Sequence, residues 1–388
     1  MNRVLKLLSD REQEMFTLLQ KMVLIQSGTR NKKGVDRVGQ LVGNYLADLP
    51  LSCKRIEQKQ LGDHLVFTTP AAGLGKYILI TGHMDTVFPE DTDFNWYRED
   101  TTKIYGPGVI DMKGGLVVTM SAVRALADTG LLEQIPLVLV FNSDEEIGSP
   151  TSIPLVEELA RGACCALVTE CGGIEGQVVT GRRGKTGYRL DVHGRAGHAA
   201  FAGKDKASAI LELCRLVPEF ENLNDAETGL VVNVGVIEGG VGQNSVAEHA
   251  GALIDSRFCS VEQGESLQRD IFQLAAVPGI PGTRSRITVT NRRPVMIQSA
   301  ANQKLYSIIR QQAGKLGIRI SDELRQGVSD ASNIAGQGVP VVDGLGPVGE
   351  NDHSDREYMI KDSLPARCRL LAASILELDR LNFSATEE

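Results

Sequence analysis

The segment KYILITGHMD, residues 76–85, indicates the fold class, because an apolar, β-rich run is followed at once by polar side chains. The first six of these residues are typical of a short buried strand. His83 and Asp85 come directly after it. In an open α/β sheet, ligands bind at the carboxyl ends of the strands. The segment therefore predicts an α/β sheet with a functional site at one edge.

Two further apolar runs end in the same way. Residues 136–141 lead to Glu145 and Glu146, and residues 163–169 lead to Glu170. Both runs are short enough for buried strands. We therefore expect three strand ends to present acidic or imidazole side chains on a shared edge.

The order of helical and alternating patterns predicts two domains, as does the length of 388 residues. Helical spacing alternates with buried strands before residue 180 and returns from residue 302. Between them, alternating strands and two helices indicate an α+β insert with an antiparallel sheet. We expect a mixed-sheet α/β domain of residues 1–180 plus 293–388, interrupted by a smaller α+β domain of residues 181–292.

Composition excludes several classes of protein. The 41 basic and 49 acidic residues give a net charge of −8, which argues against nucleic acid or an anionic membrane as the main partner. No apolar run reaches the roughly 18 residues of a membrane span. The N-terminal residues show no signal-peptide pattern, so we expect a cytoplasmic protein. Seven scattered cysteines without a C-x-x-C pair favour neither a disulfide framework nor a cysteine zinc site.

The segment YGPGVIDMKGG, residues 105–115, aims one carboxylate from a rigid turn. Alone, Asp111 could be a helix N-cap. Beside the three strand ends and a histidine from farther along the chain, it fits a ligand shared by two metal ions. The spacing alone leaves open whether that histidine is His249 or His353.

The neighbouring polar residues have divided roles in this interpretation. Asp85 lies two positions from His83, on the same face of an extended segment, and would hold the second imidazole nitrogen. The alternative is a surface histidine near a turn. Adjacent glutamates usually mark a solvated turn, but at a metal site we assign Glu146 as ligand and Glu145 as general base. Two histidines with three carboxylates favour Zn²⁺, with Co²⁺ or Mn²⁺ as substitutes, whereas Mg²⁺ or Ca²⁺ would prefer oxygen ligands alone.

HMDTVFP (83–89), GPGVIDMKGG (106–115) and DEEIGS (144–149) resemble blocks of the dinuclear zinc peptidase and deacylase family. That family includes glutamate carboxypeptidase of the carboxypeptidase G type, acetylornithine deacetylase, succinyl-diaminopimelate desuccinylase and aminoacylase. The resemblance runs from about residue 75 to 375. It implies a zinc-binding domain with an inserted lid or dimerisation domain, and hence a homodimer formed through residues 181–292.

The resemblance also implies a set of site residues and two Zn²⁺ per subunit. One zinc would be held by His83, Asp111 and Glu170, and the other by Asp111, Glu146 and His353. A hydroxide would bridge them, with Glu145 as base and Asp85 orienting His83. His353 is chosen here because NDHSD (351–355) resembles a late family block. The family also tends to have a cis peptide bond after the shared aspartate, here Asp111-Met112.

In the insert, GRAGHA (194–199) resembles the lid motif whose histidine, here His198, reaches the other subunit's active site and stabilises the oxyanion. Asn244 and Arg257 fall near family substrate contacts. Arg293 matches an arginine that clamps the substrate carboxylate, for which a guanidinium is suited. The alternative for His198 is a loop histidine without a partner. The alternative for Arg293 is a solvated hinge at Arg292-Arg293, and either Arg293 or Arg257 could be the clamp.

These expectations favour a zinc-dependent hydrolase that cuts a peptide or amide bond next to a free amino-acid carboxylate, as glutamate carboxypeptidases do. A glutamate rather than an aspartate at position 170 is similar to the carboxypeptidase and deacylase branches of the family. QGVSDA (326–331) departs from the family, because it has fewer glycines than the family's glycine-rich segment at this place. The substrate would be a small peptide or an N-acyl amino acid. The alternatives are an N-acyl-amino-acid deacylase or dipeptidase of the same family, and a non-catalytic metal-binding member.

Overall fold

The computed structural model describes residues 1–383 and divides into two compact units. Unit 1 comprises residues 1–181, 298–324 and the chain from 329 onward, and unit 2 comprises residues 182–297 and 325–328. Unit 2 extends beyond the expected boundary at residue 292 because Arg182 and Met296 exchange two backbone hydrogen bonds of 2.9 and 3.0 Å. The Arg183 N–H donates to Arg325 O at 3.3 Å, which explains why residues 325–328 also belong to unit 2.

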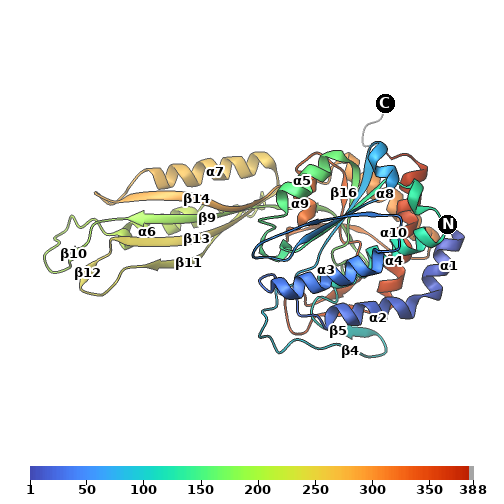
Figure 1. Ribbon diagram of the computed structural model, residues 1–388. Coiled ribbons are helices and arrows are strands. Elements are labelled where there is room, and N and C mark those ends of the chain that lie inside the picture. The colour runs from blue at the N-terminus through green and yellow to red at the C-terminus, as the bar shows by residue number, and fades with distance from the viewer. Residues whose placement is uncertain (384–388) are drawn as a thin grey trace. The chain divides into compact units, whose positions relative to one another are not determined.

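Unit 1 is built on a six-stranded sheet with the order β1-β2-β6-β3-β7-β16 (Figure 1). Neighbouring pairs among β6, β3, β7 and β16 are parallel, whereas β2 pairs antiparallel with β6 and with β1. This mixed sheet confirms the predicted α/β class. The strands are β1 (Ser52–Ile56), β2 (His64–Thr68), β3 (Tyr77–His83), β6 (Leu137–Asn142), β7 (Ala163–Val168) and β16 (Val341–Val342).

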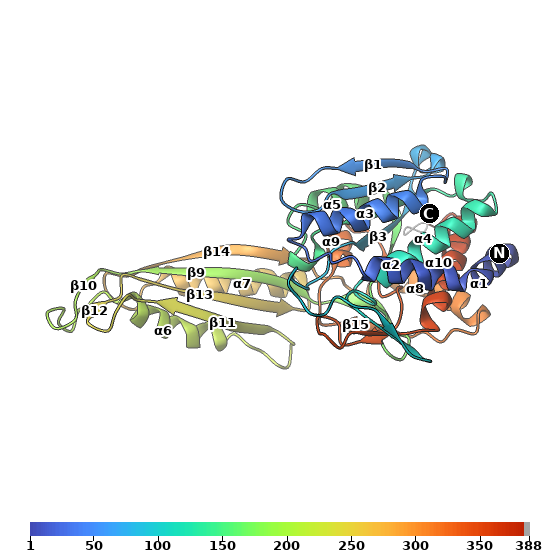
Figure 2. The same cartoon turned by 60° about the horizontal axis from the view of Figure 1, so that its bottom comes forward.

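Helices cover both faces of this sheet (Figure 2). One side packs in a large apolar core with the sheet and carries α1 (Asn2–Asp10), α2 (Glu12–Val23), α3 (Lys32–Leu46), α4 (Lys113–Asp128), α8 (Ala300–Lys315) and α10 (Ser363–Arg380). The other side carries α5 (Ile153–Gly162) and α9 (Asp330–Ala335), which contact each other and β7. Short 3₁₀ turns are η1 (Pro70–Leu74), η2 (Leu132–Gln134) and η3 (Glu145–Ile147). Coverage on both sides explains why β3, β6 and β7 read as continuous apolar runs.

The start of α4 requires glycine. A Cβ on Gly114 would lie 2.2 Å from Val109 O, and one on Gly115 would lie 1.9 Å from Thr169 O. These approaches leave no room for a side chain. The two glycines therefore allow α4 to begin immediately after the turn that carries Asp111.

A small sheet with the order β17-β18-β5-β4 joins two distant parts of the chain. It consists of β4 (Arg98–Glu99), β5 (Lys103–Tyr105), β17 (Gly349–Glu350) and β18 (Tyr358–Ile360). Since Tyr105 pairs with Tyr358, the turn after β5 lies beside the loop between β17 and β18. This pairing brings the segments of Asp111 and His353 together. A separate two-stranded sheet joins β8 (Val178–Arg182) with β15 (Asp322–Arg325).

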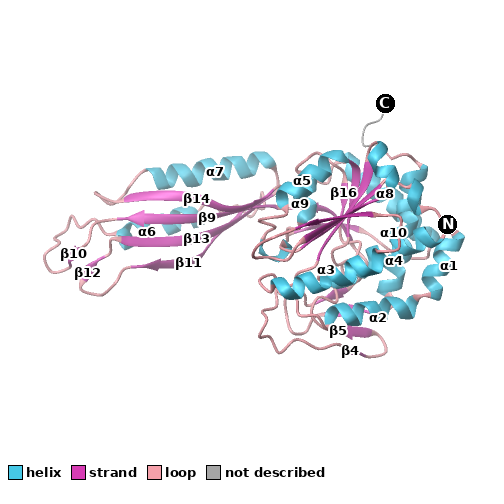
Figure 3. Cartoon of the chain, viewed as in Figure 1, coloured by secondary structure: helices cyan, strands magenta, loops and turns pink. Residues whose placement is uncertain are grey.

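Unit 2 is a four-stranded antiparallel sheet with two helices on one face (Figure 3). Its strand order is β11-β13-β9-β14. Tyr188, Leu190 and Val192 of β9 pack against the helices, so the alternate residues of β9 lie on the opposite face. The elements are β9 (Gly184–His193), α6 (Ala209–Glu221), β11 (Val231–Gly239), β13 (His249–Phe258), α7 (Val261–Ala276) and β14 (Arg284–Arg293).

A short two-stranded ribbon extends from the end of this sheet at which β9 ends and β13 begins. Its strands are β10 (Gly197–His198) and β12 (Ser245–Val246), which pair antiparallel. We call residues 194–199 and 242–248 the β10–β12 ribbon. Among the described residues, no helix is both long and apolar enough to cross a lipid bilayer.

Candidate active site

The carboxyl ends of β3, β6 and β7 lie at one edge of the unit 1 sheet. His83, the last residue of β3, pairs with Asn142 at the end of β6, and Thr81 pairs with Val168 at the end of β7. The chain then turns within a few residues to Glu145 and Glu146 in η3 and to Glu170. Parallel pairing in this register is what brings these side chains to one place.

Asp111 lies between two imidazoles. Its Oδ1 is 3.0 Å from His83 Nε2, and its Oδ2 is 3.1 Å from His353 Nε2. Glu170 Oε1 lies 3.6 Å from His83 Nε2 on one side, and Glu146 Oε2 lies 3.3 Å from His353 Nε2 on the other. Each imidazole nitrogen thus lies near one oxygen of Asp111 and one oxygen of a glutamate.

Asp352 also lies near this site. Asp111, Asp352 and His353 have potential ligand atoms within 4.8 Å of one another, as do His83, Asp111 and Glu170. Asp352 is exposed, whereas Glu146 is mostly buried. Sequence reasoning did not single out Asp352, since an exposed loop aspartate next to a histidine carries no distinguishing signal.

Asp85 connects the histidine to the acidic turn. Its Oδ1 lies 3.3 Å from His83 Nδ1, and the backbone oxygen of Asp85 lies 3.0 Å from the same nitrogen. The N–H groups of Glu145 and Glu146 each donate to its carboxylate at 3.3 Å, and the Thr29 hydroxyl donates at 2.7 Å. A fully buried carboxylate therefore fixes His83 and the η3 backbone at once. Nothing in the sequence pointed to Thr29.

Glu357 fixes the turn that carries Asp111. Its carboxylate is completely buried and accepts backbone N–H bonds from Gly108, Ile110 and Asp111 at 2.9, 2.9 and 3.2 Å. Burial raises the pKa of Glu357 to about 8, while these bonds oppose the rise. Since the donors reach both oxygens, the ionised form is the one that satisfies all three. Sequence reasoning missed Glu357, because a glutamate in a polar loop normally lies in solvent.

The backbone conformation at this turn and at His353 is unusual. The Asp111-Met112 peptide bond is cis, as the resemblance implied. His353 has a φ of 59°, in the left-handed region that residues other than glycine seldom adopt. Such conformations persist where surrounding contacts require them, and they occur often at functional sites.

Electrostatics make the cluster of carboxylates unfavourable without a cation. Burial raises the pKa of Glu170, and burial together with the Asp111 charge raises that of Glu146 to about 8. The hydrogen bonds to Asp111 and Glu146 raise the pKa of His353 to about 11. Burial also tends to raise the pKa of Asp111, but its two histidine partners lower it overall. The raised pKa values of Glu146, Glu170 and His353 reflect carboxylates that lie close together and away from water.

The donor set fits divalent metal ions. Glu146 Oε1 is buried and has no hydrogen-bond partner among residues 1–383, as expected of an atom that would face an ion. Imidazole nitrogens and carboxylate oxygens are the mixed ligands that zinc accepts. His83, Asp111 and Glu170 would hold one ion, and Asp111, Glu146 and His353 a second. Glu145 lies close enough that its charge raises the pKa of Glu170.

The remaining candidate residues belong to unit 2. His198 is exposed in β10, where its Nδ1 accepts the Ala200 N–H at 3.2 Å and its ring lies 5.1 Å from that of Phe201. Asn244 is exposed in the same ribbon, and its backbone oxygen accepts from Ala199 N at 2.9 Å. The structure therefore brings His198 and Asn244 together.

Arg257 and Arg293 both lie opposite Lys185. Arg257 of β13 and Arg293 of β14 are its cross-strand partners on either side of β9. Residues directly opposite one another share a face of the sheet, so three basic side chains form a row across it. Asp255 lies 2.9 Å from Arg257 Nε and 3.3 Å from Lys185 Nζ, whereas Arg293 is 3% exposed. We call Arg257, Lys185 and Arg293 the basic row.

Comparison with known proteins identifies the group to which the chain belongs. The pattern of Peptidase family M20/M25/M40 matches residues 79–377. Carboxypeptidase G2 from Pseudomonas sp. (strain RS-16) is 28% identical over 380 residues, covering 95% of this chain and 90% of that protein.

Solved structures agree in fold. A tripeptidase from Staphylococcus aureus subsp. aureus Mu50 has a TM-score of 0.79 at 23% identity, covering 95% of this chain and 99% of that one. The M20 family metallo-carboxypeptidase Sso-CP2 from Sulfolobus solfataricus has a TM-score of 0.73 at 17% identity, with 95% and 99% covered. At these identities the likeness concerns the fold, and it confirms the predicted fold class. With a family pattern that spans most of the sequence, this chain is a hydrolase that belongs to Peptidase family M20/M25/M40.

Proposed function

We propose that this metallopeptidase-family hydrolase cuts the peptide or amide bond next to a free amino-acid carboxylate, as a glutamate carboxypeptidase does, with two Zn²⁺ per subunit. The observation that carries the proposal is Asp111 between His83 and His353, with Glu145 close enough to Glu170 for its charge to raise the pKa of Glu170. The similarity to carboxypeptidase G2 supports the substrate class.

The chemistry is divided between the ions and the chain. Bound zinc would lower the pKa of a water to about 7 and polarise the substrate carbonyl. Glu145 would accept the proton of the attacking water and pass it to the leaving nitrogen. Asp85 would keep His83 oriented and hold the η3 backbone, so that Glu145 keeps its position during both transfers.

The basic row supports recognition of a carboxylate. Guanidinium groups bind carboxylates in a bidentate manner, and Arg257, Lys185 and Arg293 share one face of the unit 2 sheet. Asp255 already pairs with Arg257 and Lys185. We infer that Arg293 or Arg257 clamps the substrate carboxylate.

We further propose a homodimer in which His198 completes the site of the other subunit and stabilises the oxyanion. Its support in the structure is β11, an edge strand of the unit 2 sheet with Val231, Val236 and Ile237 exposed to 40, 49 and 63%. An exposed apolar edge is suited to pairing with a second chain. Mixing His198→Ala with Glu145→Ala subunits should restore part of the activity, whereas verified mixed dimers without activity would refute the shared site.

A substrate panel tests the specificity. C-terminal glutamate conjugates, N-acetyl and N-succinyl amino acids, and plain dipeptides would be compared with zinc or cobalt added. We expect the glutamate conjugates to be cleaved fastest. Preference for short acyl groups would instead support an N-acyl-amino-acid deacylase, and preference for dipeptides a dipeptidase. The family assignment already sets aside a non-catalytic protein.

A further inference from the structure

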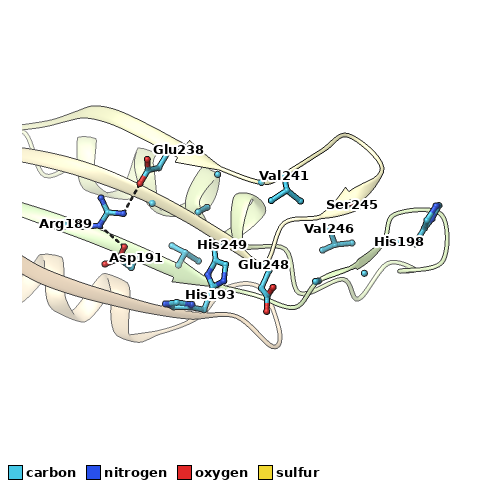
Figure 4. A pocket seen from close by; sticks show the side chains of 17 residues that line it. Arg189, Asp191, His193, His198, Glu238, Val241, Ser245, Val246, Glu248 and His249 are labelled. Atoms are coloured by element: carbon cyan, nitrogen blue, oxygen red, sulfur yellow. Dashed lines mark hydrogen bonds and ion pairs between the residues drawn. The ribbon is translucent and has the colours of Figure 1, made fainter.

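Two histidines outside the candidate active site face each other at the root of the β10–β12 ribbon. His193 is the last residue of β9, His249 is the first residue of β13, and the two are directly opposite in the antiparallel register. Their ring centroids are 4.9 Å apart, with the ring planes at 87°. Figure 4 shows the two imidazoles side by side, with Glu248 beside them.

The histidines line a hollow of about 780 Å³ on unit 2. Its other charged residues are Arg189, Asp191, Glu238 and Glu248. Arg189 is paired with both Asp191 and Glu238 at 2.8 Å. The lining therefore has an excess of negative charge, which favours a cation over an anion. Its lining includes glycines at 197, 239, 240 and 251, which have no side chains to fill the hollow. Since one water takes up about 30 Å³, the hollow has room for an ion and its bound waters.

The geometry of the pair suits a transition metal. Two nitrogens at about 2.0–2.1 Å from one zinc ion lie roughly 3–3.4 Å apart, so rotation of the two facing side chains would have to bring one nitrogen of each ring to that separation. Imidazole is a preferred ligand of Zn²⁺, Ni²⁺ and Cu²⁺. Within residues 1–383, the pair forms no group of three donors that all lie within 4.8 Å of one another. Water, or Glu248 after a rotation of its side chain, would complete the coordination.

The histidine pair lies where the two segments of the β10–β12 ribbon leave the sheet, so a bound ion would hold these segments together. Gly194 N donates to Glu248 O at 2.7 Å, so the chain segments that leave β9 and enter β13 are joined next to the two rings. These segments carry His198 and Asn244. We propose that His193 and His249 form a binding site for a divalent transition-metal ion, which links the two strands of the ribbon at their root and reduces the motion of His198 and Asn244.

Two exposed cations of β14 oppose this site, Arg284 and also Arg286, which lies opposite Asp191. Arg284 of β14 lies opposite His193 on the other side of β9, and it is exposed. Its charge would weaken binding of a divalent ion. Arg284→Gln is therefore expected to tighten metal binding severalfold without touching either ligand.

The experiment uses Ni²⁺ as the probe on the full-length, zinc-loaded protein. Calorimetric titration should reveal one Ni²⁺ site that disappears in His193→Ala and in His249→Ala and persists in His198→Ala, a matched control on the same ribbon. Hydrogen exchange of residues 195–199 and 242–247 should slow on addition of Ni²⁺ in the wild type and in His198→Ala, and should not change in His193→Ala or His249→Ala. Thermal unfolding without Ni²⁺ should be the same for all variants, which separates loss of a ligand from loss of the fold.

Identical isotherms in the wild type and both ligand variants would overturn the site. Loss of binding in His198→Ala, with binding kept in His193→Ala and His249→Ala, would place the ion elsewhere on the ribbon and would also overturn the site. Binding that depends on both histidines without slower exchange would overturn the linking of the ribbon. None of these readouts requires turnover, so the outcome is independent of the proposed catalytic function.

Discussion

The candidate metal-binding edge of unit 1 and the β10–β12 ribbon of unit 2 both carry candidate site residues, but these residues are held in very different ways. Asp111 sits on a turn whose backbone is fixed by three bonds to the buried Glu357. His198 sits on an exposed two-residue strand and accepts one backbone N–H from Ala200. Several buried hydrogen bonds fix the edge of the unit 1 sheet, whereas the β10–β12 ribbon is held by a few exposed contacts.

This difference matches the work proposed for each region. Ligands of two ions must be held close to their productive geometry, and buried hydrogen bonds supply that rigidity. A residue that meets the substrate from a loop needs freedom to approach and leave. We therefore expect substitutions at the edge to change catalysis and stability strongly, and substitutions in unit 2 to act mainly on substrate selection.

The largest effect is expected for Glu145→Ala. Loss of the general base should lower kcat by about 10³-fold or more, since proton transfer by a placed side chain contributes about 10²–10⁴-fold. Metal content should stay unchanged, because Glu145 is not among the proposed ligands. Glu146→Ala is the matched control, and it should lose metal as well as turnover. A Glu145→Ala protein with near-normal kcat would refute the base assignment.

Arg293→Ala tests the basic row. Loss of a charged contact of about 1.5–3 kcal/mol should lower kcat/KM for glutamate conjugates about 10- to 100-fold. Arg257→Ala is measured in parallel, and the variant with the larger loss of kcat/KM identifies the clamp. Arg269→Ala, on the exposed face of α7, serves as the control and should have no effect. An unchanged kcat/KM in Arg293→Ala would remove this residue from substrate binding.

Glu357→Gln tests how much the buried hydrogen bonds to Glu357 stabilise the turn that carries Asp111. The amide keeps the shape, but its NH₂ group would face backbone donors in place of an acceptor. We expect the free energy of unfolding to fall by about 2 kcal/mol, as for a buried donor left unsatisfied, with weaker metal binding as a second result. Urea unfolding measures the first and metal titration the second. Glu350→Gln, which alters one hydrogen bond to Tyr358, should change neither appreciably.

The smallest effect concerns the acid stability contributed by Asp63, which is not among the proposed metal ligands. Hydrogen bonds from Lys32, Gln58 and Arg55 outweigh burial and lower the pKa of Asp63 to about 2, below the usual value for aspartate of about 3.9. A lowered folded-state pKa stabilises the protein above about pH 4 and loses that stabilisation as the pH falls toward 2.

Asp63→Asn should therefore reduce stability at pH 7 by about 1 kcal/mol, a value discounted because Lys32 and Arg55 are partly exposed. The variant should also lose less stability than the wild type between pH 4 and 2. Chemical unfolding at several pH values would show this, and parallel pH profiles for both proteins would contradict it.

Much of the fold followed from the sequence because burial leaves a periodic pattern. The runs at 76–81, 136–141 and 163–169 predicted β3, β6 and β7, and the structure confirms these strands with small shifts at their ends. β1 and β2 were not predicted. β1 is a mostly exposed edge strand, so its residues Ser52–Ile56 have no apolar alternation.

The candidate site followed from the sequence only in part. His83, Asp111, Glu146 and Glu170 follow apolar runs or a glycine turn, which made them visible. His353 was chosen over His249 by family resemblance, because the small β17-β18-β5-β4 sheet that brings it to Asp111 has no long-range signature in one sequence. Glu357 and Thr29 were missed for a related reason, since burial of a polar residue depends on tertiary contacts.

The most direct test of the account is the number of metal ions bound by four proteins: the wild type, His83→Ala, His353→Ala and Asp111→Ala. If Asp111 is shared, each histidine variant should lose one ion and keep the other, while Asp111→Ala should lose tight binding of both, and turnover should fall in all three. Full-affinity binding of one ion by Asp111→Ala would contradict a shared ligand and with it the proposed two-metal site.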